Sequence, residues 1–269
     1  MILDEMSWPE IESLDDDAVA VLPIAATEQH GHHLPLQVDR RITQELARRL
    51  EAERTDWLVV APTLWAGASD HHLAFPGTMS VPNGVYIDLL TALVDSLLNA
   101  GFRRIVLLNG HGGNTVGMQE ALVRTRHRLG GDAHVHLAGC TYWMVAGDRM
   151  AREAGMTTPN ITHACEYETS MMLHLAGDLV HVDRAVAGHP ELPSNYFDVG
   201  FHRPSSVFAA FNMDQLTAGC GAMGEPEHAT AEKGAKLLDV VADEVGRFLD
   251  EFRQWPFVPG RGQDRPPTG

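Results

Sequence analysis

Short apolar runs alternate along this chain with segments that repeat apolar residues at helical spacing. The runs have the length and continuity of strands buried on both faces, and they lie at residues 18–26, 57–62, 104–108 and 133–138. Apolar residues three and four apart predict helices at 40–53, 85–99, 118–129, 168–175 and 229–252. Such alternation predicts an α/β fold, with a mostly parallel sheet and helices on both of its faces.

A cluster of polar residues follows the first predicted strand. The stretch TEQHGHHLPLQVD, residues 27–39, places Glu28, His30, His32, His33 and Asp39 close together. In parallel α/β folds, ligands bind beyond the carboxyl ends of the strands, where this cluster lies. Carboxylates and imidazoles are the ligands that zinc and similar divalent metals prefer. A polar surface loop is the alternative, but the motifs below favour a metal site.

The second motif, LLNGHGGN at residues 107–114, follows the third predicted strand. Its glycines allow the backbone to turn sharply and to approach a ligand closely. The motif lacks the Lys-Ser/Thr pair of a phosphate-binding P-loop and the spacing of a dinucleotide fingerprint. With His111 at its centre and Asn109 and Asn114 beside it, a metal or substrate site is favoured.

The third motif, HACEYETS at residues 163–170, opens a predicted helix. Glu166 and Glu168 diverge by roughly 200° on a helix, so they cannot both face one site. One can bind a metal, while the other holds a neighbouring group or the helix N-terminus, where acidic residues are favoured. A long loop, SDHHLAFPGT at residues 69–78, follows the second predicted strand and can form one wall of a site.

Composition narrows the class of protein. The 269 residues suit one large domain, expected to span 1–255, followed by a flexible tail rich in proline, glycine and arginine at 256–269. The net charge of −16 argues against nucleic-acid and acidic-membrane partners. No apolar run approaches the length of about 18 residues that spans a bilayer, and no secretory signal opens the chain. We expect a cytoplasmic protein whose three cysteines form no disulfide framework.

Taken in order, the motifs TEQHGxHLPxxxD, NGHGGN and HAxExETS resemble those of the creatininase (creatinine amidohydrolase) family. SxxHxxFPGT at 69–78 and GxxGxPxxAtxExG at 221–234 also fit. The resemblance covers nearly the whole chain. It implies a three-layer α/β/α domain, a homo-oligomer that is usually a hexamer, a small-molecule substrate, and two divalent ions per subunit, zinc or manganese.

The resemblance also assigns residues. Glu28 and His111 would bind one metal and His30 the other, with Asp39 bridging both. Creatininase takes a further glutamate ligand from the position that is Gly113 here, and we expect Glu166 to fill that vacancy, as a metal ligand and a catalytic residue. His163 matches the proton-shuttling histidine of the family. Contact with the substrate is expected from three residues: Trp143, His72 and His32.

The expected reaction is hydrolysis of a C–N bond in an amide, cyclic amide or formamide. Two divalent ions lower the pKa of a water molecule toward 7, so that it attacks a carbonyl while His163 gives a proton to the leaving nitrogen. Pro159 replaces a tryptophan of creatininase, so creatinine itself is not the expected substrate. Three alternatives stay open. They are peptide-precursor trimming, opening of an oxidised cyclitol, keto-sugar or lactone, and a catalytically silent metal- or ligand-binding protein.

Overall fold

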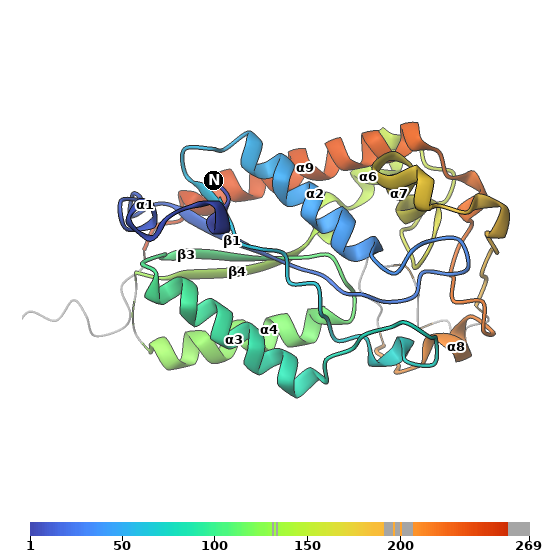
Figure 1. The fold of residues 1–269 in the computed structure, drawn as a ribbon, viewed down its shortest axis with the longest axis horizontal. Helices are drawn as coiled ribbons and strands as arrows, with labels where there is room; N and C mark the ends of the chain where they lie inside the picture. The colour runs from blue at the N-terminus through green and yellow to red at the C-terminus, as the bar shows by residue number, and fades with distance from the viewer. Residues whose placement is uncertain (131, 133, 191–195, 197–199, 201–206, 258–269) are drawn as a thin grey trace, which may run out of the picture.

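A four-stranded parallel sheet forms the centre of the protein. The computed structural model describes residues 1–130, 132, 134–190, 196, 200 and 207–257. The strands are β1 (Val19–Ile24), β2 (Leu58–Val60), β3 (Arg104–Asn109) and β4 (His136–Thr141), in the order β2-β1-β3-β4. Figure 1 shows β1, β3 and β4 between the two layers of helices. Every neighbouring pair is parallel, so all four strands end at the same edge of the sheet. This confirms the predicted fold class.

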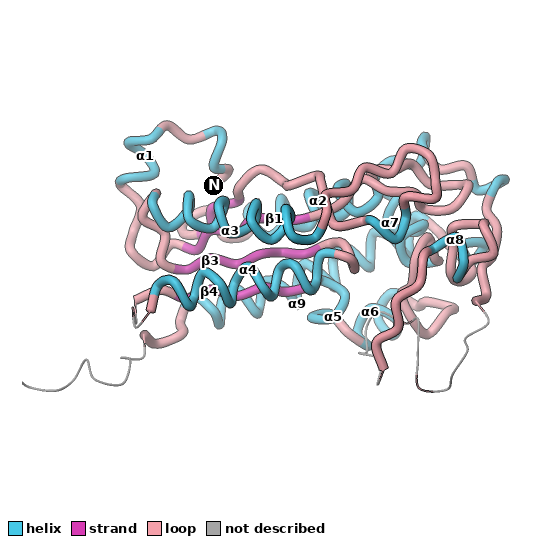
Figure 2. The backbone as a smooth tube through the Cα atoms, turned by 90° about the horizontal axis from the view of Figure 1, so that it is seen from below, coloured by secondary structure: helices cyan, strands magenta, loops and turns pink. Residues whose placement is uncertain are grey.

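Helices cover both faces of the sheet. α2 (Val38–Ala52), α7 (Glu166–Ala176) and α9 (Ala231–Arg253) lie on one face, and α3 (Asn83–Asn99) and α4 (Asn114–Leu129) lie on the other (Figures 1 and 2). These five correspond to the five predicted helices. Four shorter helices have no counterpart in the prediction: α1 (Trp8–Glu12), α5 (Tyr142–Ala146), α6 (Asp148–Ala154) and α8 (Met213–Leu216).

The strands divide their side chains between two apolar cores. Val19 and Val21 of β1 face the layer of α2, α7 and α9, whereas Ala20 and Leu22 face α3 and α4. Because both sets are buried, β1 has a continuous apolar sequence instead of an alternating one. This explains why the predicted strands, which were identified as apolar runs, correspond to the observed ones. The sheet thus holds its carboxyl edge rigidly in place for the loops that follow.

The predicted flexible tail lies largely outside the described residues, because the description ends at residue 257. The single-domain expectation for 1–255 stays a prediction. Among the described residues, no helix is both long enough and apolar enough to cross a membrane.

The packing of α9 against α7 depends on Gly234. A Cβ atom at this position would lie 1.9 Å from the carbonyl oxygen of Ser170 in α7. Gly234→Ala is therefore expected to lower the free energy of unfolding by about 1–3 kcal/mol, since the two helices must move apart. Chemical denaturation measures this change.

Gly84→Ala in α3 is the matched control. A Cβ there would have no neighbouring atom within 4 Å, so the same substitution should leave stability equal or slightly higher. If Gly234→Ala and Gly84→Ala lowered the free energy of unfolding equally, the close contact of Gly234 with α7 would not be the cause of the loss.

Candidate metal centre

Five titratable side chains from four separate segments meet beyond the carboxyl edge of the sheet. The loop after β1 supplies Glu28 and His30, the first turn of α2 supplies Asp39, the loop after β3 supplies His111, and the first turn of α7 supplies Glu168. All five are buried, and none is more than 6% exposed. Because each segment follows or packs on the same sheet edge, the fold fixes their positions relative to one another.

Asp39 lies between two halves of this cluster. Its Oδ1 is 3.1 Å from Nε2 of His30, and its Oδ2 is 3.1 Å from Nδ1 of His111. Oε1 of Glu28 lies 3.3 Å from the same nitrogen of His111, and Oε1 of Glu168 lies 3.8 Å from Nε2 of His30. The cluster therefore has a Glu28–His111 half and a His30–Glu168 half, with one carboxylate shared between them.

Three polar atoms of this cluster lie near charged neighbours but form no hydrogen bond. Oε2 of Glu28, Nε2 of His30 and Oδ2 of Asp39 are buried and have no hydrogen-bond partner. Unsatisfied buried polar groups are costly and therefore rare. One ligand atom from each of these residues lies within 4.8 Å of the others, as metal coordination requires. The residues therefore fit divalent ions.

The charges of the cluster lead to the same conclusion. Burial by itself would lower the pKa of His111, but Glu28 and Asp39 outweigh it and raise that pKa to about 10. Likewise, burial is outweighed at His30, where Asp39 and Glu168 raise the pKa well above its ordinary value. Positive charge is thus strongly favoured among these carboxylates. A divalent cation supplies it without protonating the imidazoles, which then remain free to act as ligands.

The structure does not bring Glu166 to this cluster. Its carboxylate accepts hydrogen bonds from the backbone amides of Thr157 and Thr158 and forms an ion pair with Lys233. Burial would raise the pKa of Glu166, but Lys233 and these amides outweigh it and lower the pKa. The expectation that Glu166 fills the vacant ligand position is corrected accordingly. Because residues two apart point in nearly opposite directions on a helix, the glutamate of α7 that faces the cluster is Glu168.

Gly113 cannot supply a ligand and has no room for a residue that could. A Cβ atom there would lie 2.2 Å from the carbonyl oxygen of Ala68 and 2.5 Å from Nε2 of His111. Any side chain would displace the backbone or the histidine. The second half of the cluster therefore takes its carboxylate from α7.

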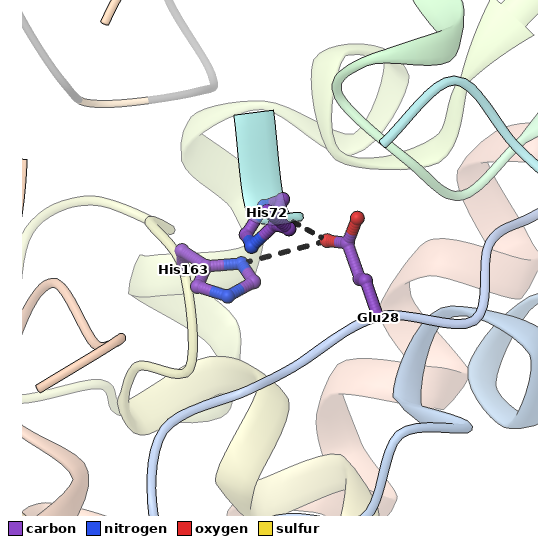
Figure 3. Close-up of side chains that lie close together, drawn as sticks. All are labelled: Glu28, His72 and His163. Atoms are coloured by element: carbon purple, nitrogen blue, oxygen red, sulfur yellow. Dashed lines mark ion pairs between the residues drawn. The ribbon is translucent and has the colours of Figure 1, made fainter. Parts of the chain in front are cut away.

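Two further histidines point at Glu28 (Figure 3). Nε2 of His72 is 3.3 Å and Nδ1 of His163 is 3.9 Å from Oε1 of Glu28. Burial, followed by the charge of His30, lowers the pKa of His163 well below its ordinary value, so its imidazole is neutral. The side-chain amide nitrogen of Gln29 lies 2.8 Å from Nδ1 of His72, and Nε2 of His163 donates to the backbone carbonyl oxygen of Gln29 at 2.9 Å, so Gln29 links the two rings.

The other two residues expected to contact substrate lie outside the groups of possible metal ligands. Trp143 is 5% exposed, is part of the apolar core, and has its ring 4.7 Å from that of Tyr142. His32 is exposed. Their substrate contacts stay predictions. Sequence reasoning did not single out His71, which joins Glu28 and His111 as a possible ligand, although the His71–His72 doublet in the second loop was a visible sign of it.

The motifs and their geometry agree with a comparison against protein families. The family described as "Creatininase: Creatinine amidohydrolase" matches residues 4–249. The chain belongs to the creatininase family. This confirms the resemblance seen in the sequence, and the creatininase-family relatives below are hydrolases.

Curated relatives of the creatininase family differ in their reactions. The chain is 29% identical over 267 residues to creatinine amidohydrolase of Pseudomonas putida, covering 93% of this chain and 96% of that one. It is 33% identical over 252 residues to the mycofactocin precursor peptide peptidase of Mycobacterium tuberculosis, covering 88% and 86%. It is also 25% identical to 3-dehydro-scyllo-inosose hydrolase of Thermotoga maritima, covering 90% and 80%.

Solved creatininase structures share the fold. A structure titled "Creatininase Mn" superposes with a TM-score of 0.78 at 26% identity, covering 94% of this chain and 99% of the other. A mutant creatininase of the "Zn-Zn type" gives a TM-score of 0.77 at 27% identity, covering 94% and 98%. These solved creatininases thus bind manganese or zinc. This chain has buried side chains that could hold such ions.

Proposed function

We propose that this creatininase-family chain is a two-metal hydrolase that takes one of its carboxylate ligands from α7. Glu28 and His111 would hold one ion, His30 and Glu168 would hold the second, and Asp39, which faces both pairs, would be shared between them. The observation that carries the proposal is the position of Asp39, whose two oxygens each lie 3.1 Å from a histidine of a different half. Three carboxylates and two neutral imidazoles nearly balance the charge of two dications.

The bound ions would polarise a carbonyl and lower the pKa of water toward 7. The chain itself supplies a proton carrier. His163 is buried and neutral, and its Nδ1 faces Glu28 at the edge of the cluster. From this position, Nδ1 accepts a proton and then donates it to the leaving nitrogen. Gln29, which contacts both His163 and His72, holds the two rings in place.

A C–N bond of a small molecule is the proposed target, as an amide, cyclic amide or formamide. Two of the three curated relatives carry names that describe cleavage of such a bond, as an amidohydrolase and as peptide peptidases. The inosose hydrolase supports a second candidate, hydrolysis of an oxidised cyclitol by the same residues. Analysis of the products distinguishes the two candidate reactions, because only hydrolysis of a C–N bond frees the nitrogen from the carbonyl group.

Metal content tests the proposal through two glutamates of one helix. Glu168→Gln removes a charged ligand, whereas Glu166→Gln makes the same chemical change at a buried carboxylate that faces Lys233. Elemental analysis of protein loaded with zinc or manganese should give about two ions per subunit in the wild type and in Glu166→Gln, and about one in Glu168→Gln.

The control variant has a readout of its own. Because Glu166 is fully buried and accepts several hydrogen bonds, Glu166→Gln should lower the free energy of unfolding by about 1–3 kcal/mol while it keeps its metal. Loss of an ion from Glu166→Gln, with both retained in Glu168→Gln, would reverse the ligand assignment. A wild type that retains no ion after loading would refute the two-metal hydrolase and favour a catalytically silent protein.

A further inference from the structure

A second site is formed at the opposite edge of the sheet from the metal centre. The end of α9 and the residues after it lie beside the first residues of β3 and β4 (Figure 1). Together with the segment before β1, they enclose a groove of about 670 Å³. Its lining includes Asp17, Trp57, Arg104, Arg253, Trp255 and Phe257.

Arg104, the first residue of β3, is a buried cation without an anionic partner. Its residue surface is only 7% exposed, and its Nε is fully buried with no hydrogen-bond partner. Within the described part of the chain it forms no ion pair. Its guanidinium lies 4.4 Å from the centre of the Phe257 ring, a cation–π contact that replaces only part of the lost hydration.

Two more basic side chains lie at this edge of the sheet, outside the lining of the groove. His136 of β4 is its direct neighbour across the sheet, and the Nε2 atom of His136 is buried without a hydrogen-bond partner. Arg126 of α4 donates one hydrogen bond to the carbonyl of Val135, while its Nε and Nη2 are buried and unpaired. Burial and then the charges of Arg104 and Arg126 lower the pKa of His136. The neutral form of His136 is therefore favoured, and the positive charge at this edge of a chain with net charge −16 comes from the two arginines.

The acidic residues of the groove are already paired. Asp17 lies 2.6 Å from a guanidinium nitrogen of Arg253, and Asp250 accepts two hydrogen bonds from Arg54 at 2.8 and 2.9 Å. Neither carboxylate neutralises Arg104. A bound anion would satisfy the buried guanidinium, and a single negative charge suits it better than two, because two carboxylates line the same groove.

We propose that this groove binds a small organic carboxylate that carries an aromatic or apolar group. The carboxylate accepts hydrogen bonds from the Arg104 guanidinium, and the apolar part packs against the rings of Trp57 and Trp255. The site is separate from the metal centre and takes no part in the proposed hydrolysis.

Benzoate is the probe, titrated into the metal-loaded full-length protein at constant ionic strength. Binding is followed by calorimetry and by tryptophan fluorescence, since two tryptophans line the groove. Arg104→Gln should weaken binding at least about tenfold. Arg124→Gln, at an exposed arginine paired with Glu120 outside the groove, should leave it unchanged. Benzyl alcohol, which has the ring without the charge, should bind at least about tenfold more weakly to the wild type.

Carboxylates also bind metals, so Asp39→Ala is included as a metal-deficient protein. It should bind benzoate as the wild type does. Four outcomes overturn the proposal: no binding by the wild type, equal binding by Arg104→Gln, tighter binding of inorganic phosphate than of benzoate, or binding that disappears in Asp39→Ala. If Arg104→Gln does not fold, the wild-type comparison of benzoate with benzyl alcohol still decides whether the groove selects an anion.

Discussion

Replacing Asp39 by alanine is expected to remove both metal ions and to lower hydrolase activity at least about a thousandfold. No other side chain of the cluster stands close to both halves through its two oxygens. Without it, His30 and His111 each lose the carboxylate nearest to them. Each half would then keep one glutamate and one histidine of the proposed ligand set, and His71 or His163 would add a neutral third ligand but not the lost negative charge. Elemental analysis and turnover of an amide panel measure the two effects.

Glu45→Ala is the matched control for this prediction. Glu45 lies on the same helix, α2, and its carboxylate is bound by Arg48 and Arg49 instead of facing the cluster. The hydrogen bond from Arg48 lowers the pKa of Glu45 to about 2, because it and the contact with Arg49 outweigh the opposite effect of partial burial. Both variants remove one ionised carboxylate from α2, but only Asp39→Ala should lose metal. If Asp39→Ala kept both ions, the bridging role would be excluded, whatever happened to activity.

Replacing His163 by alanine is expected to lower kcat by about 10²–10⁴-fold while both ions stay bound. His163 faces Glu28 at 3.9 Å, farther than the 3.1–3.3 Å that separates Asp39 and Glu28 from His111. Its Nδ1 therefore lies at the edge of the cluster, where the proposal assigns it the role of proton carrier. The KM should change much less than kcat, because the lost interaction belongs to the transition state.

An exposed histidine of α7 provides the comparison for His163. His174→Ala should leave kcat and metal content unchanged. The metal content of His163→Ala decides the role of His163. Because His163 groups with His30 and Glu168 as a possible ligand, loss of one ion would make it a metal ligand, and the proton carrier would have to be sought elsewhere.

Much of the sheet could be predicted because each strand is marked by its own short run of apolar residues. β1 and β3 are buried on both faces, so each has a continuous apolar sequence that a strand of this length requires. The four short helices could not be predicted in the same way. α5 and α6 have five and seven residues, so an apolar pattern scarcely repeats within them. They are helical because they pack against α9, which the local sequence does not show.

The cluster of possible ligands could be predicted where its side chains follow strands. Glu28, His30 and His111 come directly after β1 and β3, and parallel strands bring their ends to one edge. The choice between Glu166 and Glu168 depended instead on which side of α7 faces the sheet. That side is set by contacts between distant segments, among them the ion pair of Glu166 with Lys233 of α9. Trp143 posed a similar problem, because a large aromatic ring suits the core and a substrate pocket equally well.

The crowding at Gly113 limits how this centre could have evolved. A glutamate cannot enter the glycine-rich loop while Ala68 and His111 keep their present positions, since even a methyl group would overlap them. Moving the carboxylate ligand from α7 to this loop would thus need at least two coordinated changes, one in the loop and one at Glu168. Each change alone would leave an intermediate with a damaged site. A variant of this chain that moves the carboxylate is therefore expected to need both positions exchanged together.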